Sequence, residues 1–189
     1  MTSAQAESLR EILLDPAEAF AIDPGGTTRA AVLVPVFERS GELCLVFTAR
    51  PLGLRRHAGQ VSFPGGRADP DDVDLVATAL REAEEEIGLA PAAVSVLGAL
   101  TPLHVYASDF AVYPVVGGIE RPQGWRPAPG EVEDVIELTI AELAASHAVG
   151  AVDTPFGERV TPTFAAAGRT IWGATAFMLV DLLGRLGLL

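Results

Sequence analysis

The sequence contains no lysine, one cysteine and little positive charge of any kind. Its 13 basic residues are all arginines, and they are outnumbered by 25 acidic residues, which gives a formal net charge of −12. Nucleic acids and anionic membranes are bound without sequence preference through basic surfaces. The charge balance therefore argues against both as partners. The single Cys44 has no second cysteine for an internal disulfide, which favours a reducing, cytoplasmic location.

Long uninterrupted hydrophobic runs are also missing. The most apolar stretch, residues 171–189, contains Asp181 and Arg185, and its uncharged part is too short to span a bilayer. We expect a core-packed helix over about residues 171–187 there. The first residues, MTSAQAESLREILLD, have the pattern of a polar-faced helix over about residues 3–14 and not of a signal peptide.

The overall composition is that of an ordinary globular protein. Hydrophobic residues make up 49% of the 189 residues and charged residues 20%, which excludes intrinsic disorder as the dominant state. The length suits one domain with a full core and is short for two. Because no internal repeat, low-complexity tail or interdomain linker interrupts the chain, we expect one domain over residues 1–189.

The pattern along the chain predicts strands mixed with helices. Two apolar, β-branched runs separated by ERSGE predict a hairpin, and a long irregular segment rich in Gly, Pro, Arg and Asp follows. Helical periodicity then runs from about Asp74 to Ile87, with Gly88 placed for a C-terminal cap. We expect further strands at residues 94–100, 110–119, 132–138 and 159–166 and a short helix at residues 139–147. This arrangement predicts an α/β domain with a mixed sheet.

Residues 80–89, LREAEEEIGL, place four glutamates in five consecutive positions with Arg81 as their only cation. On a helix, Glu82, Glu85 and Glu86 share one arc, nearly opposite an apolar stripe formed by Val76, Leu80, Ala83 and Ile87. Oxygen ligands of this kind suit a hard divalent cation such as Mg²⁺ or Mn²⁺. The alternative interpretation is a solvated acidic face, which the helix pattern alone does not exclude.

The segment FPGGR lies in front of this helix and contributes Gly65 and Gly66. Paired glycines allow a close approach of the backbone to a ligand, although an isolated pair more often marks an ordinary turn. No Lys-Ser/Thr pair follows, and the G-x-G-x-x-G pattern is absent, so neither a Walker loop nor a dinucleotide fingerprint is present. A glycine turn that leads into a three-carboxylate helix is more specific than either part.

With these residues in place, the chain resembles the Nudix hydrolases, whose motif is a Gly, five residues, Glu, seven residues, then Arg-Glu-apolar-x-Glu-Glu-x-Gly-apolar. Residues 81–89 match the second half completely. The first half departs, because Asp72 stands where the motif has Glu and its spacing to Arg81 is one residue longer. The resemblance implies a Nudix-type α/β/α sandwich with a mixed β-sheet. We expect Asp72 to accept hydrogen bonds at the start of the helix.

A narrower resemblance lies upstream of the helix. Thr48, Arg50, Arg55, Gly59 and the segment 63–66 match the signature of the coenzyme A diphosphatase branch of Nudix enzymes, with Pro51 where that branch has Ser or Ala. The C-terminal stretch IWGATAFMLVDLL is also similar to that branch. This resemblance implies metal-dependent hydrolysis of coenzyme A to 3′,5′-ADP and 4′-phosphopantetheine. It assigns substrate binding to Arg50, Arg55, Gly65 and Gly66.

The same resemblance implies roles for the helix residues. Glu82, Glu85 and Glu86 would hold Mg²⁺ or Mn²⁺, and Arg81 would brace a carboxylate. The general base stays open between Glu85 and a loop residue, with Glu131 and Glu133 as candidates. We interpret His57 and His104 as structural residues and expect Phe63 to pack beneath the glycine loop.

Two alternatives to coenzyme A hydrolysis remain at this point. One is a Nudix hydrolase of another nucleoside diphosphate-linked small molecule, such as ADP-ribose, NADH or a dinucleotide. The other is a nucleotide-binding module that has the fold without turnover. The crowded glutamates argue against the second, because like charges three or four residues apart repel. The sequence does not indicate the oligomeric state.

Overall fold

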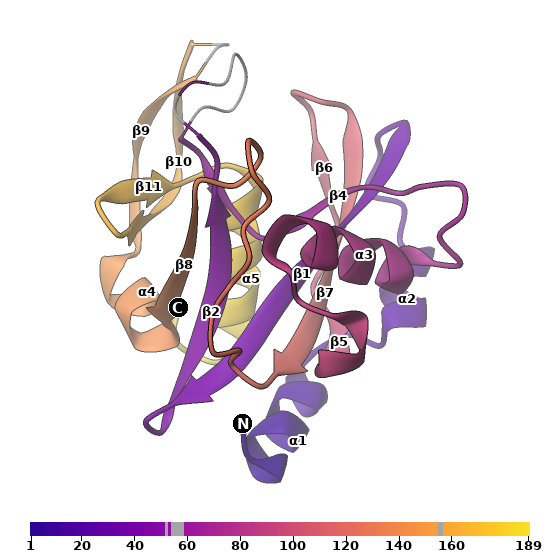
Figure 1. Cartoon of the computed structure of the whole chain (residues 1–189). Coiled ribbons are helices and arrows are strands. Elements are labelled where there is room, and N and C mark those ends of the chain that lie inside the picture. The colour runs from indigo at the N-terminus through magenta and orange to yellow at the C-terminus, as the bar shows by residue number, and fades with distance from the viewer. Residues whose placement is uncertain (52, 54–58, 155–156) are drawn as a thin grey trace.

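The computed structural model describes residues 1–51, 53, 59–154 and 157–189. These residues form an eight-stranded mixed sheet, a smaller three-stranded antiparallel sheet, and helices that pack on both faces of the larger sheet (Figure 1). The helices are α1 (Ser3–Ile12), α2 (Pro16–Ala21), α3 (Leu75–Ile87), α4 (Ile140–Ser146) and α5 (Ala174–Arg185), with a short 3-10 turn, η1 (Pro91–Ala93). The strands are β1 (Thr28–Arg39), β2 (Glu42–Ala49), β3 (Val61–Ser62), β4 (Gly65–Arg67), β5 (Val94–Ala99), β6 (Leu103–Val105), β7 (Phe110–Ile119), β8 (Asp134–Thr139), β9 (Ala148–Thr154), β10 (Gly157–Ala166) and β11 (Arg169–Ile171).

The larger sheet has the strand order β3-β2-β1-β7-β5, with β8 also paired to β2, β4 to β1 and β6 to β7. Strands β1 and β7 run parallel over nine registered pairs, whereas the other pairs of this sheet are antiparallel. The sheet is therefore mixed, as predicted. Strands β9, β10 and β11 form the smaller sheet, which lies on the other side of β8 from the centre of the larger one (Figure 1).

The predicted hairpin is confirmed, and its turn explains the register. Arg39 pairs with Glu42, so only Ser40 and Gly41 lie between the strands. Both have positive φ, at 55° and 87°. Type I′ hairpin turns have positive φ at both central residues, and their backbone twist matches that of the flanking strands.

Two hydrophobic cores lie on the two faces of the large sheet. On one face α3 packs through Leu75, Ala79, Ala83 and Ile87 against Ala31, Leu33, Val46 and Val115. On the other face α5 packs through Leu179, Leu182 and Leu183 against Val34, Phe47 and Val116. This gives the predicted α/β/α layers. Cys44 lies within the first core and is fully buried, which raises the pKa of its thiol.

Several local predictions were wrong or incomplete. The segment 51–74 was predicted to be irregular throughout, but it contains β3 and β4, and β4 consists of Gly65, Gly66 and Arg67. Glycine carries no β-strand signal, so the pairing of β4 with β1 has no trace in local propensity. The sequence also gave no sign of α2, β6, β9 and β11.

The two terminal helices are shorter than predicted. Helix α1 ends at Ile12 because Leu14 forms an isolated bridge with Ala99 of β5. Helix α5 begins at Ala174 and not at residue 171, because Ile171 pairs with Phe164 in the small sheet. In both cases tertiary pairing overrides the helical pattern at the boundary.

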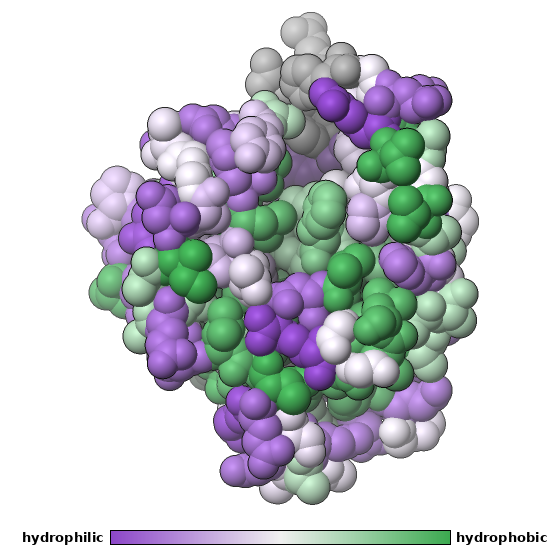
Figure 2. Space-filling model, turned by 180° about the vertical axis from the view of Figure 1, so that it is seen from behind, coloured by the Kyte–Doolittle hydropathy of each residue, from purple (hydrophilic) through white to green (hydrophobic). Residues whose placement is uncertain are grey.

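Seen from the side opposite to Figure 1, the surface is hollowed in its upper half, and hydrophobic side chains line the depression (Figure 2). The rest of this face alternates between hydrophilic and hydrophobic side chains. Within the ranges that the structure describes, no helix combines the length and the apolar character needed to cross a bilayer.

Candidate functional site

The glutamate helix α3 is fixed at both ends. At its N-terminus the carboxylate of Asp74 accepts a hydrogen bond of 2.8 Å from the backbone N–H of Ala77. At its C-terminus Gly88 has φ 70°, and the N–H groups of Gly88 and Leu89 donate to the carbonyls of Glu84 and Ala83. This left-handed glycine cap is the one that the sequence predicted. The helix therefore holds its glutamates in a defined orientation.

The buried face of α3 is broader than the sequence predicted. Leu75 and Ala79 are buried, whereas Val76 and Leu80 of the predicted stripe are only partly buried. At about 100° per residue, Glu86 falls between Leu75 and Ala79 on the helical wheel. The prediction that Glu86 lies nearly opposite the buried stripe was therefore wrong. Glu86 is one of the buried residues of the helix, with 7% exposure.

The burial of Glu86 leaves its carboxylate unusually placed. Oxygen Oε2 of this carboxylate is buried and has no hydrogen-bond partner. Burial raises the pKa of Glu86 to about 7, the positive charge of Arg50 opposes this rise, and Glu82 and Glu131 add to it. A buried carboxylate oxygen without a partner needs an explanation, and a site for a cation is one such explanation.

The two glycines of FPGGR are required by close contacts. A Cβ atom on Gly65 would lie 2.5 Å from the carbonyl oxygen of Ala31 and from Cα of Val32, because β4 crosses close to β1. A Cβ atom on Gly66 would lie 2.6 Å from the carboxylate of Glu82. The glycine pair therefore allows β4 to lie directly against the carboxylate of Glu82, whose pKa is raised by burial.

Arg81 organises the acidic groups at the start of the site. Its Nε and Nη2 donate to the two carboxylate oxygens of Asp72, both at 3.0 Å, and Nη2 also donates to the carbonyl of Arg67 at 3.0 Å. Its Nη1 donates to Glu82 at 2.8 Å and to Glu85 at 3.2 Å. These contacts use all five N–H groups that a guanidinium offers. The two-pronged contact is thus made to Asp72 and not to a glutamate of the helix.

Asp72 accepts hydrogen bonds at the start of the helix, as predicted, although the N-cap residue is Asp74. The carboxylate of Asp72 accepts hydrogen bonds from the Thr78 hydroxyl at 2.8 Å and from the backbone N–H of Asp69 at 2.9 Å, in addition to those from Arg81. These donors hold the pKa of Asp72 well below its usual range, the Arg81 hydrogen bonds most of all. Asp72 therefore anchors Arg81 from the loop side.

Glu85 differs from the other two glutamates of the predicted triplet. Its side chain is 58% exposed and is turned toward Arg81. Among the residues that the structure describes, no three His, Cys, Asp or Glu side chains converge closely enough to hold a metal ion. The structure therefore brings Glu82 and Glu86 to the glycine strand β4 and leaves Glu85 at the rim.

Arg50 lies directly after β2, next to the site. Its backbone N–H donates to the carbonyl of Gln60 at 2.9 Å, and its charge acts on Glu86. The neighbouring carbonyl of Ala49 accepts a hydrogen bond of 2.8 Å from the backbone of Glu133, so the segment that leads into β8 lies beside Arg50. Arg55, the second predicted substrate arginine, lies outside the described residues, as does His57.

The loop between β7 and β8 completes the site, and sequence reasoning missed its role. The backbone N–H groups of Arg126 and Ala128 donate to the carbonyls of Ile87 and Glu86 at 3.1 and 2.8 Å, where the end of α3 would otherwise leave them unpaired. The loop is tied down by Glu137 of β8, which accepts hydrogen bonds from Arg121 and from Trp125 Nε1. The Pro/Gly-rich composition predicted only a connection.

Phe63 and His104 take the structural places that the sequence predicted. Phe63 is buried and stacks on Phe47 with ring centroids 4.7 Å apart. His104 contacts Asp109 through Nε2 at 2.9 Å, and its ring packs at a tilt against Tyr106 with the ring centroids 4.2 Å apart. Both residues serve packing or loop geometry.

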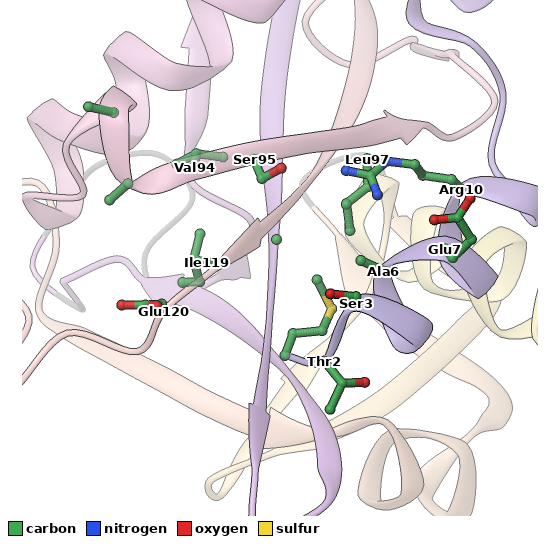
Figure 3. A pocket seen from close by; sticks show the side chains of 14 residues that line it. Thr2, Ser3, Ala6, Glu7, Arg10, Val94, Ser95, Leu97, Ile119 and Glu120 are labelled. Carbon is green, nitrogen blue, oxygen red and sulfur yellow. The ribbon is translucent and has the colours of Figure 1, made fainter.

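A cavity of about 730 Å³ lies apart from these residues, between α1 and the strands β5 and β7 (Figure 3). Its lining includes Ala6, Glu7 and Arg10 of α1 and Val94, Ser95 and Ile119 of the sheet. None of the glutamates of α3 and neither glycine of β4 lines it. The chemistry that the sequence predicted is therefore not located in this cavity.

Comparison with known proteins places these features in a family. The NUDIX domain model matches residues 27–159. A protein of Salmonella paratyphi B described as "Uncharacterized Nudix hydrolase NudL" is 40% identical over 162 residues, which cover 84% of this chain and 83% of the relative.

Two solved structures show the same fold at low identity. A MutT/nudix family protein from Enterococcus faecalis covers 99% of this chain and 75% of its own, with a TM-score of 0.57 and 13% identity. The NUDIX domain of Shewanella oneidensis NrtR, solved with ADP ribose, covers 75% of this chain and 85% of its own, with a TM-score of 0.50 and 17% identity. Family membership is shown by the match to the NUDIX domain model and by the relative at 40% identity. The chain belongs to the Nudix hydrolases, enzymes that act on nucleoside diphosphate-linked substrates and generally use divalent metal ions.

Proposed function

We propose that the protein hydrolyses the diphosphate bond of coenzyme A, releasing 3′,5′-ADP and 4′-phosphopantetheine. One observation carries the proposal: Arg50, from the segment that resembles the coenzyme A branch, acts electrostatically on the buried Glu86 of the Nudix helix. A residue of the coenzyme A diphosphatase signature and a residue of the Nudix motif thus belong to the same site. Arginine suits the anionic diphosphate because its planar fork matches phosphate oxygens.

Mg²⁺ or Mn²⁺ is the proposed cofactor, held by Glu82 and Glu86, while Glu85, at the rim and paired with Arg81, serves either as a third ligand or as the general base. The fit rests on the unpaired buried oxygen of Glu86, on the glycine strand that leaves room beside Glu82, and on an all-oxygen donor set. When bound, a divalent cation offsets the charge of the diphosphate oxygens and makes a water easier to deprotonate.

The side chains supply the remaining steps. Arg81 orients Glu82 and Glu85 through hydrogen bonds of 2.8 and 3.2 Å. The proton of the attacking water passes to Glu85 or to Glu131, both exposed carboxylates near the buried pair. Glu133, the other loop candidate, is engaged by Arg169 at 2.7 Å, which makes it the weaker candidate for the base.

The substrate is a small molecule, and we propose that residues 1–189 act as one cytoplasmic catalytic domain. Substrate contacts are assigned to Arg50 and Arg55 and to the backbone of Gly65 and Gly66. The two glycines have no side chain to block an approach, and Gly66 already lies against the Glu82 carboxylate.

A product assay tests the proposal. Purified protein is incubated separately with coenzyme A, ADP-ribose and NADH, each with Mg²⁺, with Mn²⁺ and with a chelator, and products are separated by chromatography. We expect 3′,5′-ADP from coenzyme A and loss of product in the chelator. Turnover of ADP-ribose or NADH without coenzyme A would retain the Nudix chemistry and contradict the substrate assignment.

A further inference from the structure

Arg169 reaches the edge of the site from a part of the chain that the Nudix family model does not match. It begins β11, directly after a two-residue turn in which Ala167 and Gly168 both have positive φ, 47° and 79°. This turn fixes the direction of the hairpin. Nη2 of the Arg169 guanidinium contacts the carboxylate of Glu133 at 2.7 Å.

Glu133 links Arg169 to the neighbourhood of Arg50. The backbone N–H of Glu133 donates to the carbonyl of Ala49, the residue that precedes Arg50. Strand β11 also lies against β3, which leads into the glycine strand β4. The charge of Arg50 acts on Glu86, where the bond would be cleaved, whereas Arg169 pairs with Glu133 in the segment before β8.

The Glu133 carboxylate can be replaced by another anion at the Arg169 guanidinium. The side chains are 26% and 42% exposed, and an ion pair exposed to this degree contributes little to stability. A phosphate monoester carries more charge than one carboxylate and offers three oxygens to an arginine fork. In a chain with net charge −12, a cation beside the site is scarce. A dianionic group can therefore displace Glu133 at little cost.

We propose that Arg169 binds a peripheral phosphate monoester of the substrate, and that Glu133 occupies this guanidinium until the substrate arrives. This inference rests on the proposed function, in which the peripheral group is the 3′-phosphate of coenzyme A. Arg50 contacts the diphosphate and Arg169 contacts the terminal phosphate. Arg169 is thus a specificity residue and takes no part in bond cleavage.

Kinetics with matched substrates test the proposal. The ratio of kcat/KM for coenzyme A to that for dephospho-coenzyme A is measured for the wild type, Arg169→Ala, Arg169→Lys, Glu133→Gln and the double variant. Arg169→Ala should lower the ratio at least about tenfold, the loss expected for one charge-assisted contact, mainly through KM for coenzyme A. Arg169→Lys, which keeps the charge without the fork, should fall between the two.

The glutamate variant separates recognition from a structural tie. Glu133→Gln should keep or raise the ratio, and this gain should vanish in the double variant. If the pair only fastened β11 to the segment before β8, both single variants would reduce turnover of both substrates alike. Arg10→Ala, which removes an exposed arginine of α1, is the control for the loss of one positive charge.

Binding of nucleotide products distinguishes a failure of the proposed function from a failure of the phosphate site proposed at Arg169. If the wild type cleaves neither substrate, the proposed function fails, and calorimetry with 3′,5′-ADP and AMP then decides on Arg169 alone. A wild-type preference for 3′,5′-ADP that Arg169→Ala abolishes would support the phosphate site. Equal binding of the two nucleotides by the wild type, or an unchanged ratio in Arg169→Ala, would overturn it.

Discussion

The guanidinium of Arg81 and the carboxylate of Asp72 form a two-pronged ion pair with both hydrogen bonds 3.0 Å long. Asp72 stands where the Nudix motif has a glutamate, and one extra residue separates it from Arg81. The side chain is shorter and the connecting segment is longer, yet the contact is intact. The two departures from the motif therefore offset each other in space, and the carboxylate still braces Arg81.

Asp72→Asn should destabilise the protein by about 1–3 kcal/mol, because Arg81 loses a charged acceptor for two donors in a site where the Asp72 side chain is 9% exposed. The pKa of Asp72 is lowered in the folded state, so its stabilisation is full above the unfolded value of about 3.9 and is lost as pH falls below it. Urea unfolding of both proteins from pH 7 to pH 3 measures the difference.

The matched control for this variant is Asp71→Asn, an exposed neighbour whose carboxylate forms no hydrogen bond or ion pair within the described part of the chain. Its unfolding curve should follow that of the wild type. Equal stability of Asp72→Asn and wild type at pH 7 would show that the ion pair contributes nothing to the folded state.

The two adjacent glycines should respond differently to alanine. In Gly65→Ala the new Cβ meets backbone atoms of β1 at 2.5 Å, which cannot move aside, so we expect a loss of at least about 1–3 kcal/mol and poor folding. In Gly66→Ala it meets the flexible end of Glu82, so the protein should fold while turnover falls. Thermal unfolding and kcat separate the two. Similar stabilities for both variants would contradict the packing argument.

The sequence predicted the parts of the fold that local chemistry determines. The start of α3 near Asp74, its C-terminal cap at Gly88 and the hairpin between β1 and β2 are fixed by residues within a few positions, and all lie where the pattern indicates. Strand β4 was missed because Gly65 and Gly66 pair with β1 for reasons of space, which no local propensity records. Strand β11 was missed because its partner alone defines it.

The sequence was sufficient to predict which residues form the candidate site, but not how deeply each of them is buried. The glutamates and Arg81 were recognised from their spacing, yet the helical wheel placed Glu86 nearly opposite the buried face, because only four apolar residues were taken to form that face. Which residues of a helix are buried depends on what packs over it, and here β4 and the β7–β8 loop cover the side that carries Glu86. The role proposed for Arg169 was not predictable from the sequence, because it rests on a contact with Glu133, which lies far away along the chain.

Glu86 should destabilise the metal-free protein at high pH. Its folded-state pKa is about 7, above the usual value, so its favourable contribution is complete below about pH 4.3 and is lost as pH rises through 7. Glu86→Gln does not titrate. In a chelator the variant should therefore be more stable than the wild type at pH 8, by on the order of 1–3 kcal/mol, and close to it at pH 5.

Glu84→Gln, on an exposed position of the same helix, is the control and should follow the wild type at both values of pH. Adding Mg²⁺ or Mn²⁺ at pH 8 should stabilise the wild type and the Glu84 variant but not Glu86→Gln, because only an ionised Glu86 offers its unpaired oxygen to a cation. Turnover in Glu86→Gln and Glu82→Gln should fall by orders of magnitude. Parallel stability curves in the chelator, together with undiminished turnover, would remove Glu86 from the metal site.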